Sequence, residues 1–176
     1  MSLYQSNMVD SRLHPAAINP EALLALCETT RTRRSGPGGQ NRNKVETAIV
    51  LKHRPTGIVA EANERRTQGE NLRVALFRLR LNLALEWRRE FDGTPSDLWR
   101  SRCRGGRIVV SPEHDDFPAL LAEALDAVAA NDFDVKRAAE SLECSSSQLI
   151  KFLKDEPRAL KMVNDKRHAL GLRALL

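Results

Sequence analysis

The feature that most constrains this chain is a short stretch in which three glycines and a proline lie among basic residues. It runs Arg33-Arg34-Ser35-Gly36-Pro37-Gly38-Gly39-Gln40-Asn41-Arg42-Asn43-Lys44. Five Arg or Lys residues and no acidic residue lie between Arg31 and Lys44. Glycine adopts backbone angles that other residues avoid, and proline fixes φ and removes a hydrogen-bond donor, so this stretch cannot pack as helix or strand. We expect an exposed cationic loop that suits a phosphate-rich partner.

Around this loop the sequence predicts an α+β unit. Capping and proline signals at Asn19-Pro20-Glu21 indicate a helix start, β-branched residues indicate a strand, and Pro55-Thr56-Gly57 indicates a turn between two strands. Further on, leucines recur every three or four residues on one helical face, with arginines such as Arg80 largely elsewhere. The fold expected is a small antiparallel sheet packed by a long helix, with the glycine loop projecting from one end. These elements fall at residues 22–28, 44–52, 58–62 and 68–91.

The second half of the chain predicts a small all-α, helix-turn-helix-like segment, because short apolar stretches alternate with capping residues and short turns. Asp116, Asp134 and Ser145 are the predicted caps. The helices are expected at residues 119–129, 135–142, 146–154 and from Pro157 towards His168. We therefore expect three parts: a disordered tail (1–18), a domain that holds the glycine loop and an Arg-rich connector (19–111), and a helical domain (112–176).

Charge is distributed unevenly along the 176 residues. Residues 1–111 carry 19 Lys and Arg against 11 Asp and Glu, whereas residues 112–176 carry 9 against 12. The basic half is thus the half with the glycine loop, which points to nucleic acid contact there. The connector adds Arg100, Arg102, Arg104 and Arg107, and RNA contact and a solvated surface are both open for this group.

Several function classes find no support in the sequence. No apolar run reaches the roughly 18 residues of a membrane span, and the N-terminus lacks a signal-peptide pattern. The odd, widely spaced cysteines at 27, 103 and 144 favour a reducing cytoplasm without a disulfide framework. The four histidines show no ligand spacing, so we expect no metal and no cofactor. The sequence gives no sign of oligomerisation.

Three blocks, in order, resemble the class I peptide chain release factors and their stand-alone ribosome-rescue relatives. The first is an Arg-x-Ser-Gly-x-Gly-Gly-Gln core at Arg33–Gln40, followed by Asn43-Lys44; the others are His53–Ile58 and Glu64–Asn71. The resemblance covers roughly residues 20–91. It departs from the family at Arg42, where many relatives have valine, and at Asn41, where decoding factors often have histidine.

The resemblance implies that the loop enters the peptidyl transferase centre and promotes hydrolysis of the ester between nascent peptide and tRNA. Gly38 and Gly39 then allow a tight turn, and the backbone N–H of Gln40 stabilises the oxyanion while its side chain orients water. Ser35, Gly36 and Pro37 shape the loop, and Gln68 and Asn71 support it. Contact with ribosomal or transfer RNA is expected from Arg33, Arg34, Arg42, Asn43 and Lys44, and the partners are the ribosome and peptidyl-tRNA.

Only about 30 residues precede the loop, which leaves no room for a codon-reading domain. The sequence therefore favours codon-independent rescue of stalled ribosomes. The alternative is a non-catalytic rRNA-binding factor whose helix-turn-helix half contacts a partner. Transcription regulation is a distant third, because the candidate recognition helix at 146–154 carries only Lys151 and Lys154.

Overall fold

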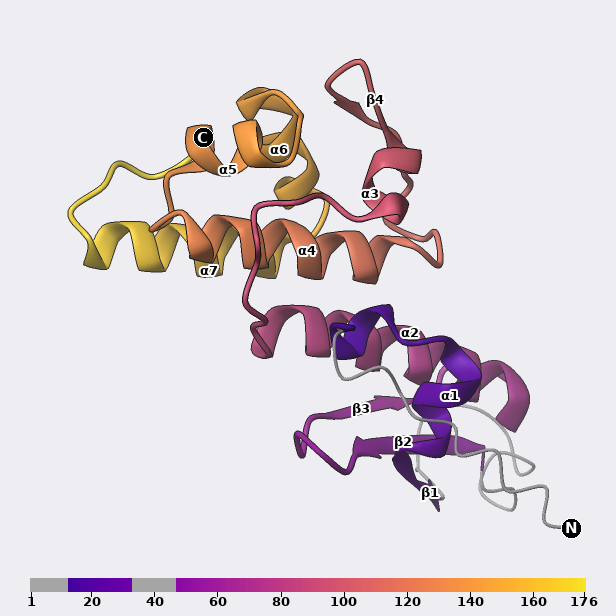
Figure 1. Ribbon diagram of the computed structural model, residues 1–176. Helices are drawn as coiled ribbons and strands as arrows, with labels where there is room; N and C mark the ends of the chain where they lie inside the picture. The colour runs from indigo at the N-terminus through magenta and orange to yellow at the C-terminus, as the bar shows by residue number, and fades with distance from the viewer. Residues whose placement is uncertain (1–12, 33–46) are drawn as a thin grey trace, which may run out of the picture.

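The protein is α+β in the computed structural model, which confirms the fold class predicted from the sequence (Figure 1). The structure describes residues 13–32 and 47–176. The elements in the first part of the chain are the 3-10 helix η1 (Pro15–Ala17), α1 (Pro20–Ala25), β1 (Cys27–Thr32), β2 (Ala48–His53), β3 (Val59–Ala62) and the long helix α2 (Gln68–Glu86). They are followed by α3 (Asp97–Arg102), β4 (Cys103–Arg104), β5 (Arg107–Ile108), α4 (Phe117–Ala130), α5 (Val135–Ser141), α6 (Ser146–Lys154) and α7 (Pro157–Ala169).

Among the described residues, β1, β2 and β3 form an antiparallel sheet in that order. Along β3, Ala60 and Ala62 are buried while Val59 and Glu61 are exposed, the alternation expected when one face of a sheet is covered. The covering element is α2, which packs on β2 and β3 through its buried positions, including Leu79. At one end of the sheet Thr32 pairs directly with Ala48. The chain therefore leaves and re-enters the sheet at adjacent points.

Strand β1 differs from the sequence prediction, which placed a helix over 22–28 leading straight into the loop. The helix instead ends at Ala25, and the chain pairs with β2 from Cys27 to Thr32. Threonines are β-branched and suit a strand, but Glu28 to Arg31 are all exposed at the edge of the sheet. An exposed edge strand carries no alternating hydrophobic pattern, which explains why the pattern did not indicate it. Strand β2 begins at Ala48, and residues 44–46 of its predicted range lie outside the described part.

Helix α2 also ends earlier than the predicted residue 91. Its last residue is Glu86, and Trp87 has extended backbone angles (φ −112°, ψ 138°). Beyond this point, hydrogen bonds to α4 take the place of hydrogen bonds within the helix. The Asp126 carboxylate of α4 accepts from the backbone N–H of Arg89 (3.0 Å) and from Nη1 of Arg88 (3.1 Å). Propensity alone gives no sign of such a partner, which lies more than 30 residues away in the sequence.

Arg80 corrects the expected division of α2 into an apolar face and an arginine-bearing remainder. Its side chain is buried. Nε donates to the carbonyl of Ala16 (3.0 Å), and Nη1 donates to the carbonyl of Asp115 (2.7 Å). A buried guanidinium is tolerated when its N–H groups find such acceptors. Arg80 therefore joins η1 and the segment before α4 to the long helix.

The helical half has the predicted sequence of short capped helices, with one correction. The Asp134 carboxylate accepts from the Lys136 N–H (2.9 Å), and the Ser145 hydroxyl accepts from the Gln148 N–H (3.2 Å), as expected of N-caps. Asp116 makes no side-chain cap on α4. Its carboxylate is taken instead by Arg102, whose Nε and Nη2 donate at 2.9 and 2.6 Å, and an ionised donor is the stronger partner.

A continuous apolar core connects the two halves of the chain. Helix α4 packs on α2 and η1, and Figure 1 shows the layers in order: sheet, α2, then α4 with the later helices. Trp99 of α3 is buried, donates Nε1–H to the Leu142 carbonyl (2.7 Å), and meets the Phe152 ring edge-on. The core cluster runs from Leu51 of the sheet to Leu149 of α6. The predicted division between residues 111 and 112 stays a prediction.

Candidate functional site

The loop predicted to carry the chemistry lies outside the described residues. This applies to Arg33, Arg34, Ser35, Gly36, Pro37, Gly38, Gly39, Gln40, Arg42, Asn43 and Lys44. Their roles stay predictions. The structure does describe both anchors of this connection, because Thr32 ends β1 and Ala48 begins β2, and these two residues are paired across the sheet. Loop and sheet are thus joined at one end of a packed, three-stranded platform.

Asn71 fastens the second anchor. Its side chain is fully buried in the first turn of α2. Nδ2 donates to the carbonyl of Thr47 (2.7 Å) and to that of Arg65 (3.1 Å), while Oδ1 accepts from the Arg65 N–H (2.9 Å). One amide therefore joins the residue before β2, the turn after β3 and the start of α2. The supporting role of Asn71 toward the loop stays a prediction.

The start of α2 is fixed by a capping box. The Thr67 hydroxyl accepts from the Glu70 N–H (3.2 Å), and the Glu70 carboxylate accepts from the Thr67 N–H (3.2 Å). The hydrogen bond from the Thr67 hydroxyl holds the pKa of Glu70 below its usual value. Gln68, the other residue predicted to support the loop, is the first residue of this helix and is half-buried. The turn beside the loop anchor therefore has a defined geometry.

Three cations near these anchors were not singled out from the sequence. Arg31 is exposed on β1, one residue before Thr32, and Arg65 and Arg66 are exposed in the turn that Asn71 ties to Thr47. They lie on the two sides of β2 at the same end of the sheet, since Ile49 of β2 pairs with Arg31 on one side and with Ala62, shortly before Arg65, on the other. The sequence did offer a signal: Arg65 and Arg66 lie within the matched block Glu64–Asn71, and Arg31 lies just before the block Arg33–Gln40. Together they extend the basic character of the loop onto the folded platform.

The four connector arginines divide into two pairs. Arg102 is half-buried and forms an ion pair with Asp116. Arg100 is near two acids: its Nη1 lies 3.8 Å from Oδ1 of Asp97, and its Nη2 lies 4.0 Å from Oε1 of Glu143. Arg104 and Arg107 are exposed, and neither has an ion pair among the described residues. The structure does not bring any of the four to the loop anchors. Their predicted RNA contact stays a prediction, with Arg102 also serving the fold.

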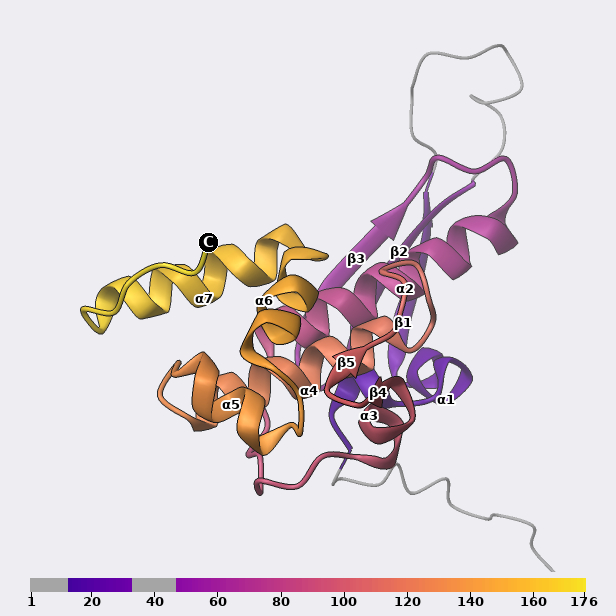
Figure 2. The same cartoon turned by 90° about the horizontal axis from the view of Figure 1, so that it is seen from above.

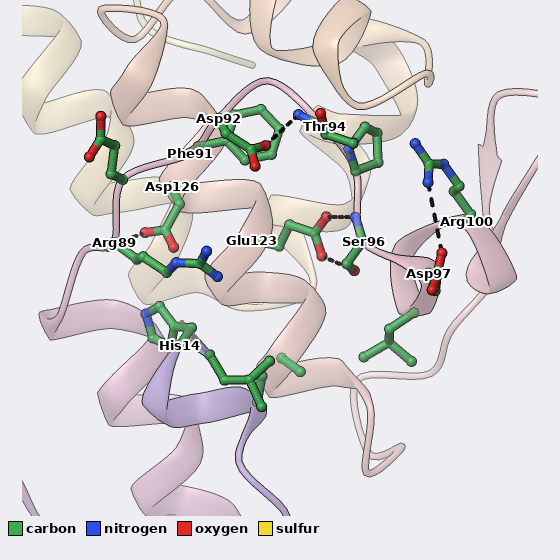
Figure 3. Close-up of a pocket in the computed structure, with 16 residues that line it drawn as sticks. His14, Arg89, Phe91, Asp92, Thr94, Ser96, Asp97, Arg100, Glu123 and Asp126 are labelled. Carbon is green, nitrogen blue, oxygen red and sulfur yellow. Dashed lines mark hydrogen bonds and ion pairs between the residues drawn. The ribbon is translucent and has the colours of Figure 1, made fainter. Parts of the chain in front are cut away.

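A pocket of about 530 Å³ lies where the link after α2 crosses α4 (Figure 3). Its walls include His14, Arg89, Ser96, Glu123 and Asp126. The Ser96 N–H and hydroxyl donate to the Glu123 carboxylate at 2.6 and 2.5 Å. Asp126 is bound by Arg88 and Arg89 as well, so the two acids that α4 contributes to this pocket hold the link on α4. Cations and acids alternate around it, so it defines no single class of ligand.

The titratable groups of the pocket are shifted by burial. Burial lowers the pKa of His14 to about 4, against the hydrogen bond from its Nε2 to the Trp87 carbonyl (3.2 Å). Burial raises the pKa of Asp126 to about 6, although the Arg89 N–H and the charge of Arg88 act to lower it. At neutral pH His14 is therefore neutral and Asp126 is charged. Both groups have a structural role, because His14 bonds to the Trp87 carbonyl and Asp126 bonds to Arg88 and to the Arg89 N–H.

Other chemistry finds little support in the described part of the chain. No group of His, Cys, Asp and Glu there is arranged to hold a metal ion. All three cysteines are free, and burial raises the pKa of each thiol, that of Cys144 to about 12. Thiolate nucleophiles are therefore not available at neutral pH. No helix in the described residues is both long enough and apolar enough to cross a membrane.

The fold and the anchors define a class of protein: an α+β platform that presents a basic Gly-Gly-Gln loop between paired strand ends, with further cations beside it. Comparison with known families agrees, because residues 17–102 match the model of the RF-1 domain. That match contains β1, the loop, the sheet, α2 and α3. Residues 17–102 therefore form an RF-1 domain, and the relatives that the chain resembles are peptide chain release factors and a release factor-like protein.

Three relatives show the extent of the similarity. Peptide chain release factor 2 of Acidovorax sp. (strain JS42) is 32% identical over 126 residues, which cover 67% of this chain and 33% of that protein. An uncharacterized mitochondrial release factor-like protein of Saccharomyces cerevisiae is 44% identical over 61 residues, covering 35% of this chain and 37% of that protein. A chloroplastic peptide chain release factor of Arabidopsis thaliana is 50% identical over 52 residues, covering 30% and 11%. The chain therefore spans no more than 37% of the length of any of these three.

Proposed function

We propose that this protein hydrolyses the ester bond of peptidyl-tRNA on the ribosome and releases nascent chains from stalled ribosomes without reading a codon. The observation that carries the proposal is the RF-1 domain match over residues 17–102, which contains the Arg33–Gln40 core. The paired anchors Thr32 and Ala48 support it, because a loop that must reach a distant active site needs a firm base. Codon independence is the expectation drawn above from the sequence.

The proposed chemistry is the placement of water and the stabilisation of charge. Water is a poor nucleophile, and holding it in line with the ester carbonyl contributes much of the barrier reduction. Gly38 and Gly39 let the chain turn so that the Gln40 N–H donates to the oxyanion of the tetrahedral intermediate. The uncharged Gln40 side chain has donors and an acceptor with which to orient the water. Ser35, Gly36 and Pro37 shape the approach of the loop.

In this proposal RNA completes the catalyst. The core Arg33–Gln40 contains no Asp, Glu, His, Cys or Lys that could act as general acid, general base or metal ligand or activate the Ser35 hydroxyl, so we expect the isolated protein to be nearly inert. Phosphates of ribosomal and transfer RNA are contacted by the loop cations and by the cations beside the anchors. These contacts involve Arg33, Arg34, Arg42, Asn43 and Lys44 together with Arg31, Arg65 and Arg66. Residues 19–111 are the proposed catalytic part and residues 112–176 a helical attachment; the cytoplasmic location indicated by the cysteines stays a prediction.

The test is release of a labelled nascent peptide from purified 70S ribosomes that carry peptidyl-tRNA. Three complexes are compared: mRNA truncated in the P site, and mRNA with a sense or a stop codon in the A site. We expect release on the truncated complex that does not require a stop codon. Release only at stop codons would contradict codon independence. Tight, salt-sensitive binding to ribosomes without release on any complex would instead support the non-catalytic RNA-binding alternative.

A further inference from the structure

The hairpin made of β4 and β5 carries an unusual pair of like charges. Each strand is two residues long, and Gly105 and Gly106 join them with φ of +56° and +74°. Positive φ at both central residues is the signature of a type I′ turn, which glycine adopts without strain. The register of this turn places Arg104 directly opposite Arg107. Both side chains are exposed.

This arrangement carries a stability cost that the neighbouring arginines avoid. Like charges directly opposite each other in an antiparallel pair are destabilising. Arg102 is neutralised by Asp116, and Arg100 by Asp97 and Glu143. For Arg104 and Arg107 the described residues offer no such acid. Departures from local rules of this kind are characteristic of functional sites, and an anion bound between the two guanidinium groups would turn the repulsion into attraction.

Backbone hydrogen bonds hold the hairpin, so the two positions that carry its arginines are fixed relative to α6. The Val109 N–H donates to the Arg102 carbonyl (2.8 Å) at the base. Near the tip, the carbonyl of Gly106 accepts from the Ser145 N–H (3.3 Å), directly before α6. Figure 1 shows the hairpin rising beside α6 on the side of the molecule that faces away from the three-stranded sheet. Figure 2 shows the two elements side by side from above. Preorganised groups lose less entropy when they bind.

The chemistry of the pair fits phosphate groups along a nucleic acid backbone. Guanidinium groups bind phosphate through two parallel N–H donors, and they suit RNA contact for that reason. The pair sits on a projecting hairpin rather than in a pocket, which favours an extended partner. Helix α6 adds exposed Ser147, Lys151 and Lys154, spaced to lie on one face. Its lysines fall in the last turns and its first turn holds serines, an arrangement for contacting phosphates rather than base edges.

We propose that the Arg104–Arg107 hairpin, docked on the turn before α6, is a second RNA-binding site that grips the phosphate backbone of an RNA helix. It lies apart from the anchors of residues 33–44 and on the opposite side of α4 from the sheet. The choice of RNA and its assignment to the ribosome rest on the proposed function, whereas the binding of nucleic acid phosphates does not. The helical half thereby gains a role: the turn before α6 supports the hairpin, while the RF-1 domain carries the loop.

The test uses the full chain with the single change Arg107→Glu. It removes one cation from the hairpin and places an acid opposite Arg104. We expect the affinity for a labelled 20-base-pair RNA duplex to fall about tenfold, and the Tm to rise by about 1–3 °C because repulsion becomes attraction. Binding to purified 70S ribosomes, measured by co-sedimentation, should weaken as well. A double variant, Arg104→Ala with Arg107→Ala, should lower the slope of log affinity against log salt by about 2.

Lys136→Glu is the matched control, because it changes the net charge equally at an exposed position on α5. We expect it to alter duplex affinity by about twofold or less. The inference is overturned if Arg107→Glu binds the duplex as tightly as wild type or loses no more than Lys136→Glu. The ribosomal assignment is overturned if 70S binding is unchanged while duplex binding falls. Loss of peptide release in Gln40→Ala, with full RNA affinity in Arg107→Glu, would leave the proposed function standing and remove this site.

Discussion

At the scale of single residues, Asn71 contributes most to the geometry of the candidate site. Its fully buried amide makes three hydrogen bonds to backbone groups of Thr47 and Arg65. A buried group that loses its partner bears its full desolvation penalty. A side chain outside the loop thus helps to hold the second loop anchor, together with the pairing of Ala48 and Thr32.

Replacing Asn71 with Ala should lower the free energy of unfolding by about 2–4 kcal/mol, because buried carbonyl and N–H groups lose their partners. Urea unfolding at neutral pH measures this change in the free energy of unfolding. Asn82→Ala is the control on the same helix: its amide also bonds a strand carbonyl, that of Val59 (2.9 Å), but the side chain is half-exposed. We expect a loss of about 1 kcal/mol there. Equal losses in the two variants would contradict the role given to Asn71.

Residue roles that depend on local pattern could be predicted, and those that depend on distant partners could not. The caps at Asp134 and Ser145 follow from local chemistry, whereas the support of the loop by Asn71 stays a prediction. Arg80 was misplaced because its acceptors, the carbonyls of Ala16 and Asp115, lie 64 and 35 residues away. The Gln40 loop itself lies outside the described residues, so its roles rest on sequence and resemblance.

At the scale of elements, the link after α2 holds the sheet-bearing half against the helical half. It passes over α4, where Asp126 binds Arg88 and Arg89 and Glu123 binds Ser96. His14, next to η1, closes the other side by bonding the Trp87 carbonyl. Two buried titratable groups, one base and one acid, therefore lie at the same junction, and their pKa shifts have opposite consequences for stability.

The direction of each effect follows from proton uptake. Burial lowers the pKa of His14 from 6.5 to about 4. Within that interval only the unfolded chain takes up the proton, so His14 costs stability as the pH falls. Burial raises the pKa of Asp126 from 3.8 to about 6. Within that interval only the folded chain keeps the proton, so Asp126 adds stability as the pH falls. In wild type the two contributions oppose each other between about pH 4 and 6.

Single variants should separate these contributions. We compare the change in unfolding free energy between pH 7.0 and 4.5, measured by urea titration, with that of wild type. For His14→Asn the change should be more favourable by about 2 kcal/mol, and for Asp126→Asn less favourable by about 2 kcal/mol. If both variants follow the wild-type pH dependence, the burial of these groups does not govern the stability of the junction.

The elements that the sequence predicted well are those with a strong period or cap, such as α2, β3, α6 and α7. Strand β1 was missed because its exposed residues carry no apolar alternation and its pairing with β2 is a tertiary event. The C-terminal end of α2 was overextended because Asp126, on a later helix, takes the groups that would have continued it. The residues up to 91 favour a helix by themselves, and nothing in their local pattern indicates that Asp126 would bind Arg88 and Arg89.

At the scale of the whole molecule, one apolar core supports two separate faces. The anchors Thr32 and Ala48 lie at one end of the sheet, and the Arg104–Arg107 hairpin lies beyond α4. The fold class could be predicted because helical and strand periods alternate clearly along the chain. The packing of α4 across α2 could not, since an apolar helix face does not specify which neighbour it covers. With both faces on RNA, the protein would be held at one site and act at the other.

The most direct test of the central claim is single-turnover peptide release at saturating protein on 70S ribosomes stalled on truncated mRNA, comparing wild type with Gln40→Ala and Gly39→Ala. If the loop supplies oxyanion stabilisation and water placement, Gly39→Ala should reduce the release rate by about 100-fold or more, and Gln40→Ala should reduce it steeply. Co-sedimentation with ribosomes should be unchanged for both. Release at the wild-type rate by Gln40→Ala would contradict the claim that this loop performs the hydrolysis.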